Sequence, residues 1–420
     1  MSEGVYNYSH ELIHDASKLM STYFQKNIHF SRVEQLSEPD RRNLILRLII
    51  ENPTTQMPSS LILKQTATEK NVFESGAPAE TEQEQLSRFA HDWAGLALLT
   101  EIKTDHGPHF YDGSLEHKYM VIEDLGESHP SLVGPLTRKS NAGNVTEAMQ
   151  ALRSYVRRLG HMHADTAGKY NQYLAILNQV YPNALRFSFL PESDASRIEK
   201  QLKQLTGYTS KALSVEISSI LDFSQSPKDF HVFLHGDICP DNVYYQNNKI
   251  QLIDFEWGDF GHALIDASYL RMHMPSCWCS KAVPLAVVEE MEALYRQELI
   301  KGVPNAADDI IYNQQLTYAC AYWLIRTLKQ LNDIGLLENE WICPSGPTDS
   351  DSQWDPKKNA FRPRILSRLT AFITCSKTTG HLPKLYEASQ LLLTHLKTLW
   401  PDTSLIEVFS VFQNNDEGCI

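Results

Sequence analysis

The residues best suited to chemistry are Asp237, Asn242 and Asp254, which lie near one another in the second half of the chain. A carboxylate such as that of Asp237 can accept the proton of a reacting hydroxyl group. The amide oxygen of Asn242 and the carboxylate of Asp254 are hard oxygen ligands of the kind that Mg²⁺ binds. One short segment therefore supplies a candidate base and two candidate metal ligands.

The sequence around these residues predicts the backbone that holds them. An apolar run at 232–234 predicts a strand that leads into His235, Gly236 and Asp237. Two further runs, at 243–245 and 249–253, flank a polar turn and predict a hairpin whose second strand ends at Asp254. A His-Gly-Asp sequence alone is a common turn, and it is the complete succession of strand, loop and hairpin that favours a catalytic role.

This succession resembles the catalytic segment of the aminoglycoside phosphotransferase and choline kinase superfamily, the small-molecule relatives of protein kinases. The family pattern is H-G-D-x-x-x-x-N followed by I-D-F/W-E/G, and the chain has HGDICPDN at 235–242 and IDFE at 253–256. Asp266 resembles the family aspartate that braces the catalytic loop, and 159–164 resembles a family helix ending in Leu-His-Ala. The resemblance extends from about residue 30 to residue 271.

The resemblance implies transfer of the γ-phosphate of ATP to a hydroxyl group, with Mg²⁺ ions bridging the β- and γ-phosphates. It implies that Asp237 is the catalytic base and that Asn242 and Asp254 bind the metal ions. It also implies that His235 and Asp266 support the catalytic loop structurally.

The fold implied by the resemblance is α+β and protein-kinase-like, with two lobes. Residues 1–124 are expected to form a small nucleotide-clamping lobe with an antiparallel sheet, one main helix and the hinge at its end. Residues 125–420 are expected to form a larger, mostly helical lobe. That lobe carries the catalytic loop at 235–242, the metal-binding strand at 250–256 and the acceptor site.

Three antiparallel strands are predicted in the first part of the chain, at 31–36, 43–50 and 60–65, because β-branched and apolar runs alternate there with turn residues. Lys64 lies on the third strand, and the resemblance implies that its ammonium group reaches the α- and β-phosphates. The alternative is an ordinary solvent-exposed strand lysine, since lysine is rarely buried without a partner.

A helix is predicted at 80–99, where apolar residues recur every three or four positions. The resemblance implies that Asp92 on this helix pairs with Lys64, although many relatives use the longer glutamate. Glu82 and Glu84 remain alternatives, and acidic residues at these positions also suit the first turn of a helix.

The stretch 119–126 predicts a buried strand that runs into a glycine turn. The resemblance implies an inter-lobe hinge, in which Glu123, Asp124 and Leu125 bind adenine through their main chain; an ordinary edge strand is the alternative. The turn at 37–43 departs from the expected pattern because it contains no glycine, which a close backbone approach to phosphate usually favours.

The second half of the chain is predicted to be mostly helical. Helical periodicity is present at 144–163, 199–221, 283–299, 307–331 and 382–399. The segment 343–362 predicts a long exposed loop. Tyr318, Tyr322 and Trp323 are spaced as in a helix core, and an acceptor pocket is the alternative for them.

The composition is typical of a globular protein. The 420 residues are 42% hydrophobic and 21% charged, which is enough for two substantial cores. A formal net charge of −13 argues against a nucleic-acid partner, which would need a basic surface. The acids Glu256, Asp259 and Asp266 would permit a cationic substrate. With neither a signal peptide nor an apolar run long enough for a membrane helix, a cytoplasmic location and no membrane partner are expected.

The remaining metal-type residues predict no further site. Cys277 and Cys279 have no second cysteine pair at zinc-like spacing, so the seven cysteines are expected to be reduced packing thiols. His161 and His163 lie two residues apart on a predicted helix and therefore face different sides.

Together these observations predict an ATP- and Mg²⁺-dependent kinase that acts on a hydroxyl of a small molecule of the aminoglycoside, amino-alcohol or sugar type. They leave the acceptor and the oligomeric state open. Two alternatives are a nucleotide-binding pseudokinase, favoured only by Asp92 and the glycine-free turn, and a kinase that acts on a protein-bound hydroxyl.

Overall fold

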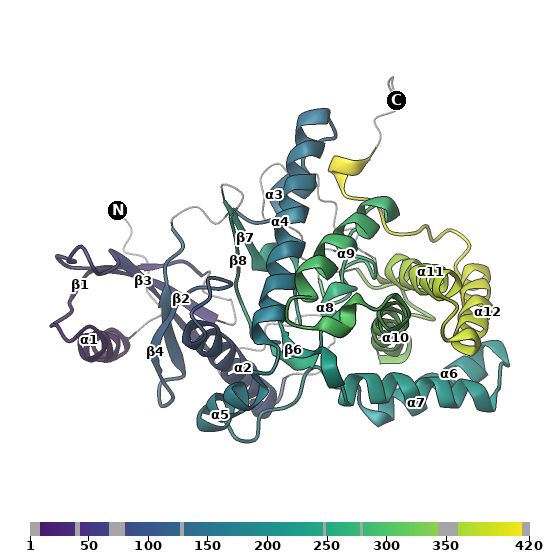
Figure 1. The fold of residues 1–420 in the computed structure, drawn as a ribbon, viewed down its shortest axis with the longest axis horizontal. Helices are drawn as coiled ribbons and strands as arrows, with labels where there is room; N and C mark the ends of the chain where they lie inside the picture. The colour runs from purple at the N-terminus through teal and green to yellow at the C-terminus, as the bar shows by residue number, and fades with distance from the viewer. Residues whose placement is uncertain are drawn as a thin grey trace. The chain divides into compact units, whose positions relative to one another are not determined.

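The computed structural model describes residues 9–37, 43–66, 80–126, 130–246, 249–277, 280–333, 335–342 and 360–413. These residues form two compact units (Figure 1). Unit 1 comprises Met1–His129, Asn171–Leu185 and Gln251–Trp257, and unit 2 comprises Pro130–Tyr170, Arg186–Ile250 and Gly258–Ile420. Most of the glycine-free turn and of the predicted loop at 343–362 lies outside the described residues, as do the tip of the 246–248 turn and Cys279.

Unit 1 is built on a five-stranded antiparallel sheet with the order β1-β2-β3-β5-β4 (Figure 1). The three strands predicted from the sequence are confirmed, and β4 and β5 complete the sheet. The bounds are Phe30–Gln35 (β1), Asn43–Ile50 (β2), Ser60–Thr66 (β3), Phe110–Ser114 (β4) and Tyr119–Glu123 (β5). Because β3 pairs with β2 on one side and β5 on the other, the central strand carries Lys64.

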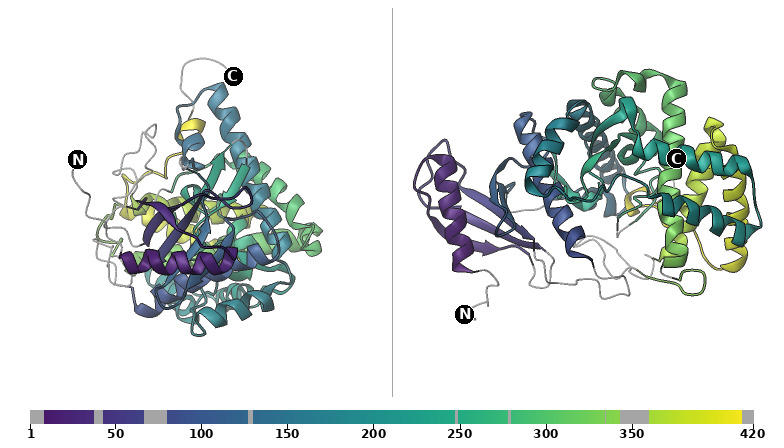
Figure 2. Two further views of the ribbon diagram at one scale, coloured as in Figure 1. Left: turned by 90° about the vertical axis from the view of Figure 1, so that its left-hand side faces the viewer. Right: turned by 90° about the horizontal axis from the view of Figure 1, so that it is seen from below.

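A helix that the sequence analysis did not predict, α1 (His10–Phe24), packs along this sheet (Figure 2). Its buried face contains Leu12, Ala16 and Met20, which recur every four residues and join one apolar cluster with sheet residues that include Leu61 and Leu63. Side chains alternate between the two faces of a strand. Lys64 therefore projects from the face of β3 opposite to α1.

The predicted helix at 80–99 is α2 (Glu82–Glu101). Thr81 and Glu84 form a capping box at its start, in which each side chain bonds the backbone amide of the other. His91, in the middle of α2, is fully buried and contacts the hydroxyl of Tyr173 at 2.5 Å and the carbonyl of Leu185 at 2.7 Å. These contacts hold most of α5 (Tyr170–Val180) to α2, so residues 171–185 belong to unit 1 although the sequence prediction placed them in the C-terminal lobe.

Unit 2 is mostly helical, so the predicted α+β fold class is confirmed. Its helices are Val133–Thr137 (α3), Ala142–Thr166 (α4), Glu192–Thr206 (α6), Lys211–Gln225 (α7), Leu264–Ala267 (α8), Leu285–Leu299 (α9), Asp309–Asp333 (α10), Phe361–Thr379 (α11) and Pro383–Leu399 (α12). Helix α4 packs against α9, α10 against α11, and α11 against α12 (Figure 1). None of the described helices is long and apolar enough to cross a membrane.

Four short strands lie near the predicted catalytic segment. They are His231–Leu234 (β6), Val243–Gln246 (β7), Lys249–Leu252 (β8) and Asp259–His262 (β9). Strand β6 pairs with β9, and β7 pairs with β8 as the predicted hairpin. The predicted catalytic loop follows the end of β6, so a paired strand fixes its starting point.

One helix prediction was wrong. The expected single helix at 199–221 is two helices, α6 and α7, because Gly207 ends α6 in the left-handed conformation with φ of 72°. The Gly207 amide donates to the carbonyl of Lys203, which caps the last turn. A glycine inside a periodic pattern is tolerated in many helices, and the apolar spacing hid this one.

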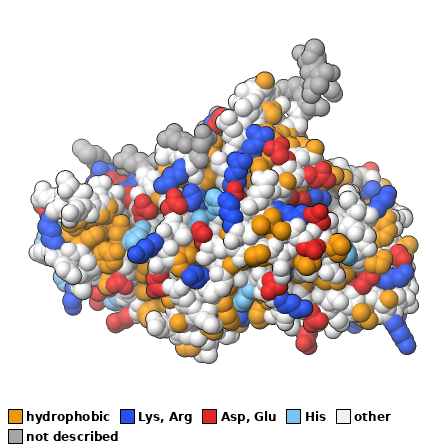
Figure 3. All heavy atoms as spheres, in the orientation of Figure 1, with side chains coloured by type: hydrophobic (Ala, Val, Ile, Leu, Met, Phe, Trp, Pro, Cys, Tyr) orange, Lys and Arg blue, Asp and Glu red, His pale blue; other side chains and the backbone are white. Residues whose placement is uncertain are grey.

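The face of the molecule in Figure 3 carries Lys and Arg side chains interspersed with Asp and Glu side chains. No single-sign basic surface is present on that face.

Helix α4 offers a matched test of close helix packing. A Cβ at Gly160 would lie 2.7 Å from the carbonyl oxygen of Tyr295 in α9, whereas at Gly143 the nearest atom is 3.4 Å away. We expect Gly160→Ala to lower the free energy of unfolding by about 1–2 kcal/mol, because overpacking outweighs the roughly 1 kcal/mol gain in helix propensity. Gly143→Ala should leave it unchanged or slightly raised. Urea unfolding measures both, and equal stability of the two variants would contradict the close approach of α4 and α9.

Candidate active site

Three of the predicted site residues meet in unit 1. The Lys64 ammonium on β3 lies 2.6 Å from a carboxylate oxygen of Asp92 on α2 and also forms an ion pair with Asp254. The Lys64 side chain is only 11% exposed and that of Asp92 only 2%. The alternative of a solvent-exposed strand lysine is therefore wrong, and Asp92 is the α2 acid that faces Lys64.

Charge balance explains how these groups tolerate burial. Burial lowers the pKa of Lys64, but the Asp254 and Asp92 carboxylates outweigh this effect and raise it, so Lys64 stays protonated. The pKa of Asp92 is raised above its usual value, because burial and the nearby Asp254 carboxylate outweigh the opposing effects of Lys64 and the backbone amide of Phe255. That amide donates to the second Asp92 oxygen at 3.0 Å. With both carboxylate oxygens occupied, Asp92 is held in one orientation.

The other acids of α2 have different partners. The Glu84 carboxylate accepts a hydrogen bond from the backbone amide of Thr81 at 2.7 Å and so caps the helix. Glu82 is exposed in the first turn. Neither residue takes the place of Asp92 as the partner of Lys64.

The segment that carries Asp254 is bound to the sheet and to α2 of unit 1 through three consecutive residues. Asp254 pairs with Lys64, Phe255 donates to Asp92, and Glu256 lies 3.4 Å from the buried guanidinium of Arg88 on α2. Asp254 has a φ of 67°, a left-handed conformation that few residues other than glycine adopt. Backbone strain of this kind concentrates at functional positions and persists only where surrounding contacts hold it.

The predicted hinge ends in a side-chain cluster within unit 1. The Asp124 carboxylate accepts hydrogen bonds from Arg47 at 2.6 Å and 3.1 Å, from Ser60 at 2.7 Å and from the Gly126 amide at 3.0 Å. Because β5 lies between β3 and β4, the edge-strand alternative is wrong. The Asp124 side chain is occupied, and the Arg47 partner was not foreseen.

Glu123 at the end of β5 is also engaged locally. Its backbone amide donates to the His109 carbonyl at 2.8 Å, and its carboxylate accepts from the His109 amide at 3.1 Å. Adenine binding by Glu123, Asp124 and Leu125 therefore stays a prediction about their main chain.

In unit 2, Asp266 lies beneath the start of the catalytic loop. Asp266 is 1% exposed, and its carboxylate accepts hydrogen bonds from the backbone amides of His235 at 2.7 Å and Gly236 at 3.2 Å. The ring of His163 lies 3.4 Å from the same carboxylate and is itself bonded to the hydroxyl of Tyr295. This arrangement fixes the backbone immediately before Asp237.

Asp237 itself is surrounded by hydrogen-bond donors. The thiol of Cys239 lies 3.3 Å and the hydroxyl of Tyr269 lies 3.4 Å from one of its carboxylate oxygens. Burial raises the pKa of Asp237 above its usual value, and a hydrogen bond from Ser276 opposes that rise. The side-chain amide nitrogen of Asn242 donates a hydrogen bond to the Asp237 carbonyl at 2.9 Å. The side-chain oxygen of Asn242 takes no part in this contact.

The acids expected to permit a cationic substrate are engaged in protein contacts. Glu256 pairs with Arg88, Asp259 with Arg186 at 2.9 Å, and Asp266 with the catalytic loop. The net negative charge therefore gives no support to a cationic acceptor at these residues.

The aromatic residues of α10 belong to the core of unit 2. Tyr322 is 1% and Trp323 is 4% exposed, and the Trp323 indole donates to the carbonyl of Ile265 at 2.8 Å. The helix-core prediction is confirmed for these two residues. The guanidinium of Arg326 lies over both rings.

The comparison with protein families agrees with the resemblance. Residues 109–298 match the family model described as the phosphotransferase enzyme family. The predicted phosphotransferase resemblance is therefore confirmed for this part of the chain, which contains the catalytic loop, Asp254 and Asp266. Lys64 and Asp92 lie before the matched range.

Solved structures give distant similarities along most of the chain. A choline kinase from Cryptosporidium parvum Iowa II is 13% identical, with 91% of this chain and 99% of that chain covered and a TM-score of 0.45. An ethanolamine kinase from Plasmodium vivax is 11% identical, with 89% and 92% covered and a TM-score of 0.42. A choline kinase from Streptococcus pneumoniae is 14% identical, with 87% and 99% covered and a TM-score of 0.39. No curated protein sequence matches the chain.

Removal of the Lys64 charge should lower the stability of the protein and change how that stability depends on pH. In Lys64→Met the buried Asp92 loses its cation, and breaking a buried pair costs about 3–5 kcal/mol near neutral pH. Without the Lys64 charge, the pKa of Asp92 in the folded variant rises further above its unfolded value of about 3.9, so Asp92 takes up a proton. Stability should therefore fall as pH rises from about 4 through the folded pKa. Urea unfolding at several pH values measures the effect.

The double variant Lys64→Met/Asp92→Asn is the matched control, because asparagine keeps an acceptor for the Phe255 amide without a charge. It should recover stability near neutral pH and lose the added pH dependence. A loss below about 0.5 kcal/mol in Lys64→Met at every pH, typical of exposed substitutions, would contradict the buried pair.

Proposed function

We propose that this protein is an ATP- and Mg²⁺-dependent kinase that transfers the γ-phosphate to a hydroxyl group of a small molecule. The observation that carries the proposal is the braced catalytic loop, in which Asp237 follows two backbone amides fixed by Asp266. The loop lies within the range that matches the phosphotransferase family. Transfer is direct, and no covalent intermediate on the protein is required.

Asp237 is the proposed base, and its surroundings support that role. A carboxylate with a raised pKa is a better proton acceptor than an ordinary aspartate, since its pKa lies closer to the operating pH. The Tyr269 and Cys239 contacts orient the carboxylate. Its main contribution is to position the acceptor hydroxyl for in-line attack and to receive its proton.

Asn242 and Asp254 are the proposed ligands for Mg²⁺. Their donor atoms are an amide oxygen and carboxylate oxygens, which fit a hard cation. The Asp254 side chain is 34% exposed, so a ligand can reach it. When bound, Mg²⁺ neutralises charge on the phosphate oxygens.

Lys64 is the proposed ligand of the α- and β-phosphates, and Asp92 positions its ammonium group. The proposed adenine contacts are main-chain groups at Glu123, Asp124 and Leu125, since the Asp124 side chain is bound to Arg47. His235 and Asp266 have a supporting role in the catalytic loop. The acceptor is proposed to be of the aminoglycoside, amino-alcohol or sugar type.

The exchange of one carboxylate for an amide tests the proposed base. Asp237→Asn keeps the shape of the side chain but cannot take a proton, so turnover should fall by roughly 10²–10⁴ while ATP affinity is retained. In the parent, kcat/KM should fall as pH decreases through the raised pKa of Asp237, and the variant should lack this acidic limb. ADP release and mass spectrometry of an alcohol and amino-sugar panel measure turnover, and calorimetry measures ATP affinity.

Asp222→Asn is the control, because Asp222 is an exposed carboxylate of α7 in the same unit. It should match the parent in every assay. Equal product from parent and Asp237→Asn would remove Asp237 from catalysis. Binding of ATP without product from any acceptor in the parent would instead favour a nucleotide-binding pseudokinase.

A separate substitution tests the metal ligand. Asp254→Ala removes a charged oxygen ligand, so ATP binding and turnover should require a higher Mg²⁺ concentration than in the parent. Glu116→Ala, which removes an exposed carboxylate of unit 1, should keep the parental Mg²⁺ dependence. Calorimetry of ATP binding across a Mg²⁺ series compares the variants. An unchanged Mg²⁺ requirement in Asp254→Ala would show that this carboxylate does not bind the metal.

A further inference from the structure

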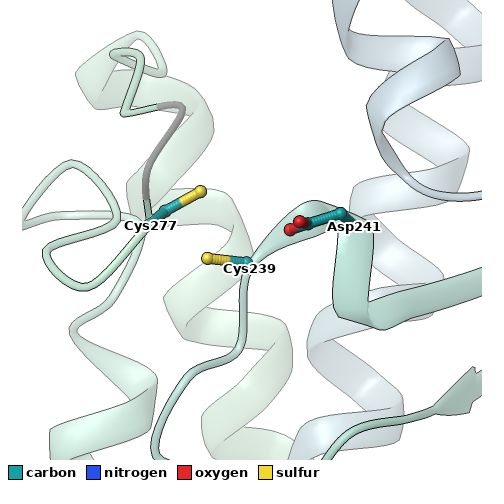
Figure 4. A group of neighbouring side chains, drawn as sticks. All are labelled: Cys239, Asp241 and Cys277. Carbon is teal, nitrogen blue, oxygen red and sulfur yellow. The ribbon is translucent and has the colours of Figure 1, made fainter. Parts of the chain in front are cut away.

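Two cysteines and an aspartate converge beside the catalytic loop of unit 2. The ligand atoms of Cys239, Asp241 and Cys277 all lie within 4.8 Å of one another. Figure 4 shows the two sulfurs and the carboxylate directed toward a common space. Both cysteines are buried and free of disulfide bonds, and Asp241 is half-buried.

The backbone holds both cysteines in place. The Cys239 amide donates to the Asp237 carbonyl at 2.8 Å, and the Cys277 amide donates to the Met274 carbonyl at 3.1 Å. The carbonyl of Cys277 accepts a hydrogen bond from the buried Arg364 at 3.1 Å. The backbone positions of the two cysteines are therefore fixed, and side-chain rotation is enough to adjust the distances between the ligand atoms.

We propose that Cys239, Asp241 and Cys277 form a binding site for a thiophilic divalent cation of the zinc class. Zn²⁺ binds sulfur at about 2.3 Å and carboxylate oxygen at about 2.0–2.2 Å, which places tetrahedral ligand atoms less than about 4 Å apart. The observed cluster lies within reach of that spacing. Two sulfur ligands favour zinc-class ions over Mg²⁺, which prefers oxygen. Three protein ligands leave the fourth position for water.

Occupation of this site also affects the environment of Asp237. The Cys239 sulfur lies 3.3 Å from the Asp237 carboxylate and 3.1 Å from the Tyr269 hydroxyl. A bound cation displaces the two thiol protons to solvent, so Cys239 no longer donates to Asp237. The binding site itself does not depend on the proposed function, because its ligands are distinct from Asn242 and Asp254.

A second pair of buried cysteines provides an internal control. Cys320 on α10 and Cys375 on α11 are hydrogen-bonded to each other. Within the part of the chain that the structure describes, the Cys239 cluster is the one group in which three such ligands come together. The pair on α10 and α11 therefore has thiols but no complete ligand set.

Cobalt titration of the reduced full-length chain tests the site, with Co²⁺ as a spectroscopic substitute for Zn²⁺. We expect a thiolate-to-cobalt charge-transfer band in the near ultraviolet that saturates at a single Co²⁺ per chain. Added Zn²⁺ should displace Co²⁺ and abolish this band, and excess Mg²⁺ should not. The band reports sulfur ligation alone, so Co²⁺ at the proposed Mg²⁺ ligands does not contribute to it.

The variants locate the ligands. Cys239→Ser and Cys277→Ser should lose the band, and Cys320→Ser should keep it. Asp241→Asn, a nearly isosteric change, should weaken Co²⁺ binding by about tenfold or more, since even an outer-shell partner contributes about 10–100-fold.

Two results would overturn the site. One is the absence of a charge-transfer band in the reduced parent at saturating Co²⁺, an outcome that does not depend on whether any variant folds. The other is a band that persists in both Cys239→Ser and Cys277→Ser. A Cys239–Cys277 disulfide in protein isolated under a thiol-free reductant would count against the site as well, because the two sulfurs would then be bonded to each other and could not bind a cation.

Discussion

The buried ammonium group of Lys64 constrains the arrangement of unit 1. A charge that is almost completely removed from water must be paired, because its desolvation costs several kcal/mol. Asp92 and Asp254 supply that pairing, and they come from α2 and from the segment after β8. Three distant parts of the sequence therefore have to meet at one point on the sheet. The contacts of Phe255 with Asp92 and of Glu256 with Arg88 extend the same requirement along the chain.

Unit 2 also contains a buried charged group, but this group is a carboxylate. Asp266 is buried, its carboxylate accepts hydrogen bonds from two backbone amides, and the ring of His163 lies 3.4 Å away. A buried carboxylate replaces its lost water contacts with hydrogen bonds from backbone amides, and these bonds fix the geometry of the loop that carries the amides. The loop at 235–242 thus begins from a defined position, and the Asn242 side chain at its end donates a hydrogen bond to the Asp237 carbonyl. Each unit uses one buried charge to hold the polar residues that the sequence singled out.

Much of this could be predicted because it is encoded locally. The strands β2 and β3 are visible as apolar runs between turn residues, and the loop from His235 to Asn242 is a contiguous motif. The Lys64–Asp92 pair followed from resemblance, since nothing in either local sequence indicates burial. Helix α1 was missed although its apolar residues recur every four positions, because its partner surface is a sheet formed later in the chain.

The features that could not be predicted depend on contacts between distant residues. Arg47 with Asp124, Arg88 with Glu256, and Cys239 with Cys277 have no spacing signature, because only the fold brings their elements together. The break at Gly207 is different, since the residue was visible but its left-handed conformation was not. Composition was misleading in one respect. The net charge permitted a cationic acceptor, yet Glu256, Asp259 and Asp266 are committed to protein partners.

Because Glu256, Asp259 and Asp266 are bound to protein partners, selectivity for the acceptor has to come from other groups. Long-range attraction by net charge raises the local concentration of an ion, but it does not distinguish one small cation from another. Discrimination instead requires groups that lose a hydrogen bond or a contact when the wrong molecule binds. As the proposed base, Asp237 would supply one such requirement, since only a hydroxyl that reaches its carboxylate could be positioned for transfer. The remaining specificity must come from the shape and polarity of side chains near that carboxylate, among which Tyr269, Cys239 and Ser276 already share its hydrogen bonds.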